Sequence, residues 1–359
     1  ASISPVFPEI MRALNISGRE VGLLITFFTF PGMVLTPILG ILADNYGRKK
    51  ILVPSLLLFG AAGGMCGFAR DFELLLILRF IQGIGMASLG VLNITILGDL
   101  YTGTERSRAI GYNSATVSIG IAIYPVIGGV IAVAGWYYPF FLAFLAIPAG
   151  LLILFYLDNP EPDNNKNIKE YLRSAFKAAI NKNVILIFIN SFITFLVIFG
   201  TVVIYFPLFL EERFSLSAVE IGLIMSALSL ATAAASSQMG KLNKLFSKRA
   251  LLYIAFGLYS AGLFIVPFVD NIWLMSVPLL LYGIGNGINI PNFIAMLADY
   301  TAEEHRAVMM SISGIFLRFG QTIGPILMGY IFIICGINGT FFAASFISVI
   351  MIFTFLIIK

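Results

Sequence analysis

The feature that most constrains this chain is an internal repeat, since shifting the sequence by about 200 residues aligns its two halves almost without gaps. Chance matches are common between apolar segments, but here charged residues, glycines and prolines recur in the same order. The matching pairs include Glu20 with Glu220, Gly83 with Gly283, Asp99 with Asp299, Arg106 with Arg306, and Pro125 with Pro325. A unit written twice in this way predicts two structurally equivalent halves.

Both halves are too apolar for a soluble domain. Of 359 residues, 59% are hydrophobic and 11% are charged, whereas soluble domains carry about 25% charged residues. The apolar runs are about 20 residues long, which is the length of a bilayer-spanning helix. We therefore expect an all-α polytopic membrane protein in contact with the lipid bilayer. The expected spans are 20–43, 51–68, 73–98, 109–134, 138–157, 184–210, 219–240, 251–269, 272–297, 307–335 and 339–358.

The repeat period contains six spans, an even number, so both halves should have the same orientation and be related by a pseudo-twofold axis along the membrane normal. We predict a first six-helix half at 1–157, a cytoplasmic linker with a surface helix at 158–183, and a second six-helix half at 184–359. The seventh span begins near Val184, whose counterpart would precede residue 1. We therefore expect helix 1 to be truncated in this sequence by roughly 15–20 residues.

A short polar segment from Gly40 to Lys50 separates the first two complete spans. Its three adjacent cations favour the cytoplasmic side of the membrane, and the net charge of +4 has the same explanation, since the cations lie mainly in loops. The charge therefore does not indicate a nucleic-acid partner. The segment resembles the G-x-L-a-D-r-x-G-R-k motif between helices 2 and 3 of major facilitator superfamily transporters. The matching residues are Gly40, Leu42, Asp44, Gly47 and Arg48.

The resemblance implies a conformational latch at the cytoplasmic ends of the two halves, formed by Gly40, Asp44, Gly47 and Arg48, with Asp99 as the partner of Arg48. The alternative is a solvated basic turn that only fixes topology. In the second half Lys244 replaces the acid and Ser247 the second glycine. Only a pairing of Lys248 or Arg249 with Asp299 could survive there, so we expect the first latch to be the stronger one.

Two arginines fall inside expected spans, where an ionisable residue indicates function by default. Arg79, with Gln82, resembles the R-x-x-q-G-x-g motif of helix 4 and would line the substrate cavity or couple transport; alternatively it snorkels to the surface. Arg318 lies ~18 Å along its helix from the cytoplasmic end. Its partner would be a carboxylate of the missing part of helix 1, a substrate anion or carbonyl dipoles. Asn190, Asn286 and Asn289 are further cavity candidates, with interhelical hydrogen bonding as the alternative for each.

The span 109–134, which would be helix 5, resembles the G-x-x-x-G-P-x-x-G-G motif associated with drug/proton antiporters of the superfamily. It departs from the motif at Tyr124, where bulk would alter helix packing or place a phenol in the cavity. The span 307–335, which would be helix 11, has a glycine, Gly324, at that position. The alternative is a kinked packing helix common to many transporters. The helix-bend motif consists of Gly120, Pro125, Gly128, Gly129, Gly320, Gly324 and Pro325.

The resemblance implies the major facilitator fold and transport by alternating access of the two halves around a midplane site. We predict proton-coupled efflux of small amphipathic or drug-like compounds. The alternatives are a permease for a specific, possibly anionic, metabolite and, from another class, a membrane-embedded receptor or sensor. We expect no enzymatic activity, cofactor or metal, a monomeric protein, and a location in a plasma membrane or a bacterial or archaeal inner membrane.

Overall fold

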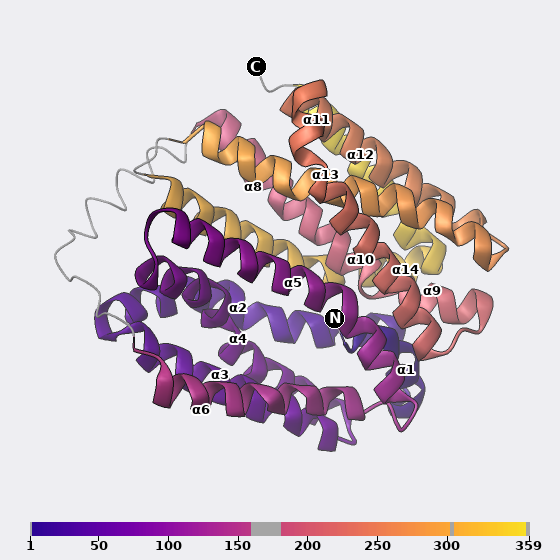
Figure 1. Ribbon diagram of the computed structural model, residues 1–359. Coiled ribbons are helices and arrows are strands. Elements are labelled where there is room, and N and C mark those ends of the chain that lie inside the picture. Colours follow the sequence, from indigo (N-terminus) through magenta and orange to yellow (C-terminus); the bar gives the residue numbers. More distant parts are fainter. Residues whose placement is uncertain (1, 159–180, 302–304, 357–359) are drawn as a thin grey trace.

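The computed structural model describes residues 2–158, 181–301 and 305–356, and in these residues every regular element is a helix (Figure 1). The first half contains η1 (Ser4–Val6), α1 (Phe7–Leu14), α2 (Gly18–Tyr46), α3 (Arg48–Met65), η2 (Cys66–Phe68), α4 (Phe72–Leu100), α5 (Gly103–Ala132), η3 (Tyr138–Leu145) and α6 (Ala146–Tyr156). The predicted surface helix in the linker falls outside the described residues.

The second half contains α8 (Lys182–Val197), the π-helical turn η4 (Ile198–Val202), α9 (Tyr205–Phe214), α10 (Ala218–Ser237), α11 (Met239–Leu245), α12 (Lys248–Ile265), η5 (Val266–Phe268), η6 (Ile272–Met275), α13 (Ser276–Asp299) and α14 (Arg306–Leu356). Gly336 breaks α14 into two helices, because its φ of 66° is one that glycine adopts easily. In the described residues ten stretches are long and apolar enough to cross a membrane, and the last of them contains both spans on either side of Gly336.

The repeat is visible in the details of the local structure. Ser17 caps α2 in a capping box with Glu20, and Ser217 caps α10 in the same way with Glu220. The helices that precede these caps end on left-handed residues, Asn15 (φ 51°) and, 200 positions later, Ser215 (φ 53°). Equivalent residues therefore start equivalent helices, because the same polar caps satisfy the same free backbone amides.

Helix pairs within each half also make equivalent contacts. Thr36 Oγ1 donates a hydrogen bond to the carbonyl oxygen of Ala87 (2.7 Å), and Ser236 Oγ donates one to that of Gly287 (2.9 Å). These bonds join α2 to α4 and α10 to α13. The residue numbers differ by 200 in both partners, so the two halves share one internal packing arrangement.

The interface between the halves demonstrates the predicted pseudo-twofold axis. A Cβ atom placed on Gly22 of α2 would lie 3.6 Å from the Cβ of Pro325 in α14, and one on Gly222 of α10 would lie 2.5 Å from the carbonyl oxygen of Pro125 in α5. Exchanging the two halves converts one contact into the other, as twofold symmetry requires. The parallel repeat and the two-bundle fold are thus confirmed.

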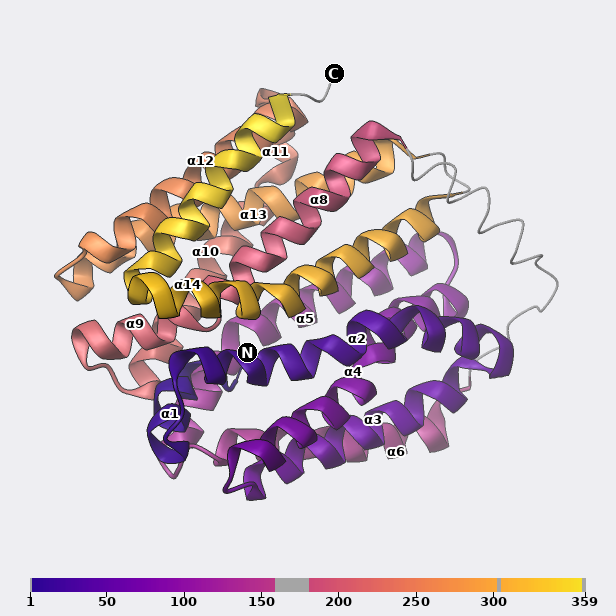
Figure 2. The same ribbon diagram turned by 180° about the vertical axis from the view of Figure 1, so that it is seen from behind.

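The two ends of the molecule differ in how closely the halves approach. We call the end that carries residues 44–50 and 244–249 the basic end, and the other the opposite end. At the opposite end Arg12 pairs with Glu211 (3.1 Å), and Tyr205 donates a hydrogen bond to the carbonyl oxygen of Gly18 (3.3 Å). Toward the basic end the bundles diverge (Figures 1 and 2), and no atom approaches the Cβ positions of Gly40 and Gly240 within 4 Å.

The glycine contacts predict a stability difference between two leucine variants. Gly222→Leu inserts a side chain against the carbonyl of Pro125, whereas Gly257→Leu on α12 meets open space. We expect Gly222→Leu to cost about 1–3 kcal/mol through overpacking, and Gly257→Leu to cost little. Thermal unfolding of both proteins in detergent measures the difference. Equal melting temperatures for the two variants would show that the close contact at Gly222 is not required.

Candidate functional site

Arg79 lies buried within the first half, with 5% of its surface exposed. Its Nε donates a hydrogen bond to the carbonyl oxygen of Leu24 (3.2 Å) and its Nη1 donates one to Oε1 of Gln82 (2.7 Å). The guanidinium carbon also lies 4.2 Å from the centre of the Phe28 ring. Arg79 therefore does not snorkel to the surface, and dipoles and an aromatic face stabilise its charge inside the bundle.

Arg318 crosses from the second half onto the first. Its Nη1 would lie 2.6 Å from a Cβ placed on Gly32 of α2, and its Nη2 3.9 Å from one on Gly90 of α4. Glycine at these positions leaves room for the guanidinium against both helices. Within the described residues no hydrogen bond or ion pair engages this guanidinium, and the Asp and Glu residues lie in loops or within the terminal turns of helices. Among the described residues the guanidinium therefore lies at the interface of the halves without a polar partner.

Threonine hydroxyls join the halves next to Arg318. Thr322 Oγ1 contacts Thr29 Oγ1 at 3.0 Å, and Thr26 donates a hydrogen bond to the carbonyl oxygen of Thr322 (3.3 Å). All three side chains are buried. They satisfy one another at the interface between α2 and α14, so this part of the interface is closed to water.

The asparagine candidates form a network within the second half. Asn190 Nδ2 donates to Oδ1 of Asn289 (3.3 Å), and Asn289 Nδ2 donates to the hydroxyl of Thr194 (2.7 Å). Tyr259 donates to Oδ1 of Asn286 (2.8 Å). Asn190 and Asn289 have no exposed surface, so in this conformation they join α8, α12 and α13 rather than line a cavity.

The two basic clusters occupy equivalent places. Arg48 forms ion pairs with Asp99 and, at 3.5 Å, with Asp44, and Lys248 pairs with Asp299. Gly47, between α2 and α3, has a φ of 101° that favours glycine, whereas Gly40 meets open space. All the paired groups belong to their own half. The structure thus brings the predicted latch residues together without joining the two bundles through them.

The glycines of the helix-bend motif have distinct neighbours. Gly320 and Gly324 pack against the backbone of α8 at Phe192 and Leu196, while Gly128 and Gly129 lie against the backbone of Ser2 and Ala218. Tyr124, at the position of Gly324, is 47% exposed, and its ring lies 3.2 Å from a Cβ placed on Gly120. In α14 the equivalent face packs against α8, whereas in α5 the phenol of Tyr124 occupies this face.

Several contact residues were not predicted from the sequence. Thr194 and Tyr259 connect the asparagines, and Gly32 accommodates Arg318. Arg19 donates a hydrogen bond to Tyr330 (3.3 Å) and lies over its ring at the opposite end. The repeat gives a signal only for residues that recur in both halves. Gly32 and Arg318 do not recur, because the equivalent positions hold Thr232 and Ser118.

No group of three or more His, Cys, Asp and Glu side chains in the described residues is placed to hold a metal.

Relatives of known function resemble the chain over most of its length. Multidrug resistance protein 1 of Bacillus subtilis (strain 168) is 27% identical over 349 residues, covering 96% of this chain and 88% of the relative. The bacillibactin exporter of the same organism is 26% identical and covers 89% of this chain and 83% of its own. Quinolone resistance protein NorA of Staphylococcus aureus (strain COL) is 26% identical, with 92% and 85% covered.

Solved structures share the fold at lower sequence identity. A bacterial homologue of the human lysosomal transporter Spinster, inward-facing and unoccupied, matches with a TM-score of 0.82 at 18% identity, over 99% of this chain and 93% of that one. The human organic anion transporter MFSD10 matches with a TM-score of 0.70 at 16% identity, over 99% and 89%. The family model described as "Major Facilitator Superfamily" matches residues 1–219 and again 202–359. With its duplicated six-helix bundle, this chain belongs to the major facilitator superfamily.

Proposed function

We propose that the protein exports small amphipathic or drug-like compounds by alternating access. The observation that carries the proposal is the pair of symmetry-equivalent glycine–proline contacts between the halves. The halves touch at the opposite end, and the bundles diverge at the basic end. Two rigid, equivalent bundles that meet at one end can rock about a central site. The similarity to multidrug and quinolone resistance proteins supports the substrate class.

The proposed orientation places the basic end in the cytoplasm, because Lys and Arg concentrate there. The structure then represents a conformation open to the cytoplasm, in a plasma membrane or a bacterial or archaeal inner membrane. We propose that residues 1–157 and 184–359 form the two halves and that residues 158–183 form the linker. We also propose that the protein is monomeric, couples transport to protons and has no enzymatic activity. Proton coupling needs a titratable carrier, and the described midplane residues include no carboxylate.

Transport by the reconstituted protein tests the proposal directly. Inverted vesicles with an imposed pH gradient should accumulate a cationic dye, and dissipating the gradient should abolish the uptake. Empty vesicles control for passive partition. Accumulation without a pH gradient, driven by an imposed sodium gradient instead, would contradict proton coupling while preserving transport. Absence of any gradient-dependent movement of amphipathic compounds would contradict the export function.

The basic clusters are proposed as conformational latches of unequal strength. Arg48 has two carboxylate partners and is 12% exposed, whereas Lys248 has one and is 35% exposed. A less exposed cation loses more when its partner is neutralised, because less water replaces the carboxylate. The alternative function of these residues, a basic turn that only fixes topology, predicts no difference between the two clusters.

Neutralising the acids at the two equivalent positions distinguishes these functions. Asp99→Asn should lower the transport rate by about tenfold, within the usual range of conformational coupling energies, while Asp299→Asn should lower it less than about threefold. Asp44→Asn should also impair transport with expression intact. Rates are normalised to the amount of folded protein in the membrane. Equal rates for Asp99→Asn and the unmodified protein would remove the latch.

A second candidate function is transport of an anionic metabolite, and Arg318 is the observation that favours it. The guanidinium lies at the interface of the halves without an acidic partner in the described residues, and a buried cation attracts a substrate carboxylate or phosphate strongly. The likeness to a bacillibactin exporter is consistent with a substrate other than a general drug.

Charge removal at Arg318 separates the two substrate classes. If the substrate is anionic, Arg318→Gln should reduce uptake of organic anions by at least about tenfold, and Arg318→Lys should restore part of it. If the substrate is a cationic amphipath, Arg318→Gln should leave dye transport unchanged or raise it. Competition between a series of organic anions and a cationic dye in the same vesicles measures both outcomes.

A further inference from the structure

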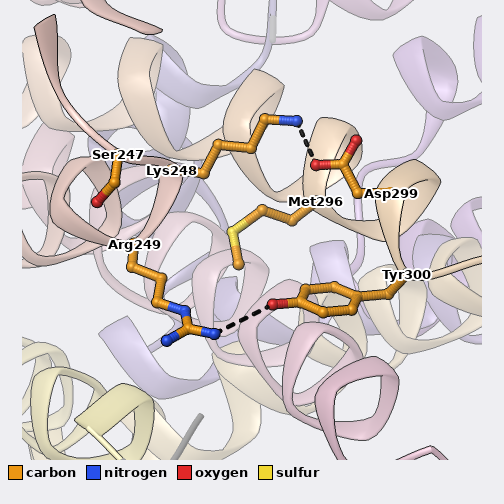
Figure 3. Close-up of a pocket in the computed structure, with 6 residues that line it drawn as sticks. All are labelled: Ser247, Lys248, Arg249, Met296, Asp299 and Tyr300. Carbon is orange, nitrogen blue, oxygen red and sulfur yellow. Dashed lines mark hydrogen bonds and ion pairs between the residues drawn. The ribbon is translucent and has the colours of Figure 1, made fainter. Parts of the chain in front are cut away.

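A pocket of about 480 Å³ lies at the basic end of the second half, away from the interface between the bundles. It is lined by the N-cap and first two residues of α12 and by the end of α13 with the residue that follows it, namely Ser247, Lys248, Arg249, Met296, Asp299 and Tyr300 (Figure 3). Transport through a central site does not explain this pocket, because its lining belongs to one bundle alone.

The two cations of the pocket have unequal partners. Lys248 forms an ion pair with Asp299, whereas Arg249 donates a 3.5 Å hydrogen bond from Nη2 to the hydroxyl of Tyr300. Figure 3 shows the side chain of Met296 between these two pairs. No carboxylate of the described residues pairs with Arg249, so among the residues that line the pocket this cation has no acidic partner.

The equivalent place in the first half has a different arrangement of partners. There, Lys49 donates a hydrogen bond to the carbonyl oxygen of Leu157 (2.7 Å), and Arg48 contacts both Asp44 and Asp99. At positions 44, 48, 49, 50 and 99 the first half has three cations and two acids, a net charge of +1. The second half has three cations and one acid, a net charge of +2, because Lys244 replaces Asp44 and Ala250 replaces Lys50.

The start of α12 adds to the attraction for an anion. Ser247 caps the helix by accepting a hydrogen bond from the backbone amide of Ala250 (3.2 Å). Lys248 and Arg249 occupy the first turn, where the helix dipole favours a negative group. A guanidinium beside a helix N-terminus presents N–H donors in the arrangement that suits the oxygens of a phosphate.

The surroundings of the pocket suit a ligand that also has an apolar part. The buried Met296 lines it, and Ile254 and Ile294, further along the apolar parts of α12 and α13, are 36% and 43% exposed. Basic pockets between helices at a membrane surface are typical sites for anionic headgroups. A lipid phosphate would place its acyl chains at the depth of these isoleucines.

We propose that this pocket binds a phosphate group, contacted by Arg249 and by Lys248 at the N-terminus of α12. Two sources can present the group: the headgroup of an anionic phospholipid, or inorganic phosphate in solution. The proposal concerns equilibrium binding to one bundle, so a binding measurement tests it without a transport assay.

Native mass spectrometry of the full chain in detergent tests it with matched lipids and variants. The probes are phosphatidylglycerol and phosphatidylcholine with identical acyl chains. Arg249→Gln removes the guanidinium while leaving the Lys248–Asp299 pair, and Lys241→Gln removes an exposed charge of the same sign at the same end, outside the pocket. We expect Arg249→Gln to weaken phosphatidylglycerol binding by about tenfold and Lys241→Gln to weaken it by less than about twofold.

The remaining measurements separate the sources and control for folding. Displacement of phosphatidylglycerol by millimolar inorganic phosphate would assign the site to free phosphate as well, and resistance to it would assign the site to lipid. Arg249→Lys should bind with intermediate affinity and serves if Arg249→Gln proves unstable, which its melting temperature reveals. Equal binding of both lipids, or equal losses in Arg249→Gln and Lys241→Gln, would overturn the proposal.

Discussion

The close approach of glycine and proline across the pseudo-twofold axis is the contact on which the architecture depends. Gly22 packs on Pro325 and Gly222 on Pro125. In lipid there is little hydrophobic drive for helices to associate, so tight van der Waals packing at small residues holds bundles together. Proline adds to this because it leaves a backbone carbonyl without its usual donor and kinks its helix. Two such contacts, exchanged by symmetry, fix how the bundles meet at one end.

Buried charge is handled differently in the two halves. Arg79 is stabilised entirely inside one bundle, by a carbonyl, an amide oxygen and an aromatic ring. Arg318 instead reaches out of its bundle to the glycines of the other half. An arginine satisfied within a rigid bundle contributes to that bundle in every conformation, whereas one at the interface changes its environment as the bundles rock. The two equivalent bundles therefore differ in where their buried arginines lie.

The same division appears at the basic end. A single acid in the first half, Asp44, corresponds to Lys244 in the second. In the first cluster Arg48 pairs with both acids, while in the second Arg249 lines a pocket. Because a duplicated unit begins with two equal copies of each cluster, one copy can keep an internal ion-pair network while the other becomes available to a ligand. In this conformation the ion pairs of both clusters remain within their own bundles.

The sequence by itself determined the helical class, the spans, the parallel repeat and the family, because spanning length, helix caps and recurring glycines and prolines are all local signals. It also paired Arg48 with Asp99 through the resemblance. Only the tertiary structure decided that Arg79 stays buried, that Asn190 and Asn289 satisfy each other across helices, and that Arg318 rests on Gly32. These outcomes depend on how far each helix is rotated about its axis and which partner lies within 3–4 Å, and a single sequence of uniformly apolar helices leaves both quantities undetermined.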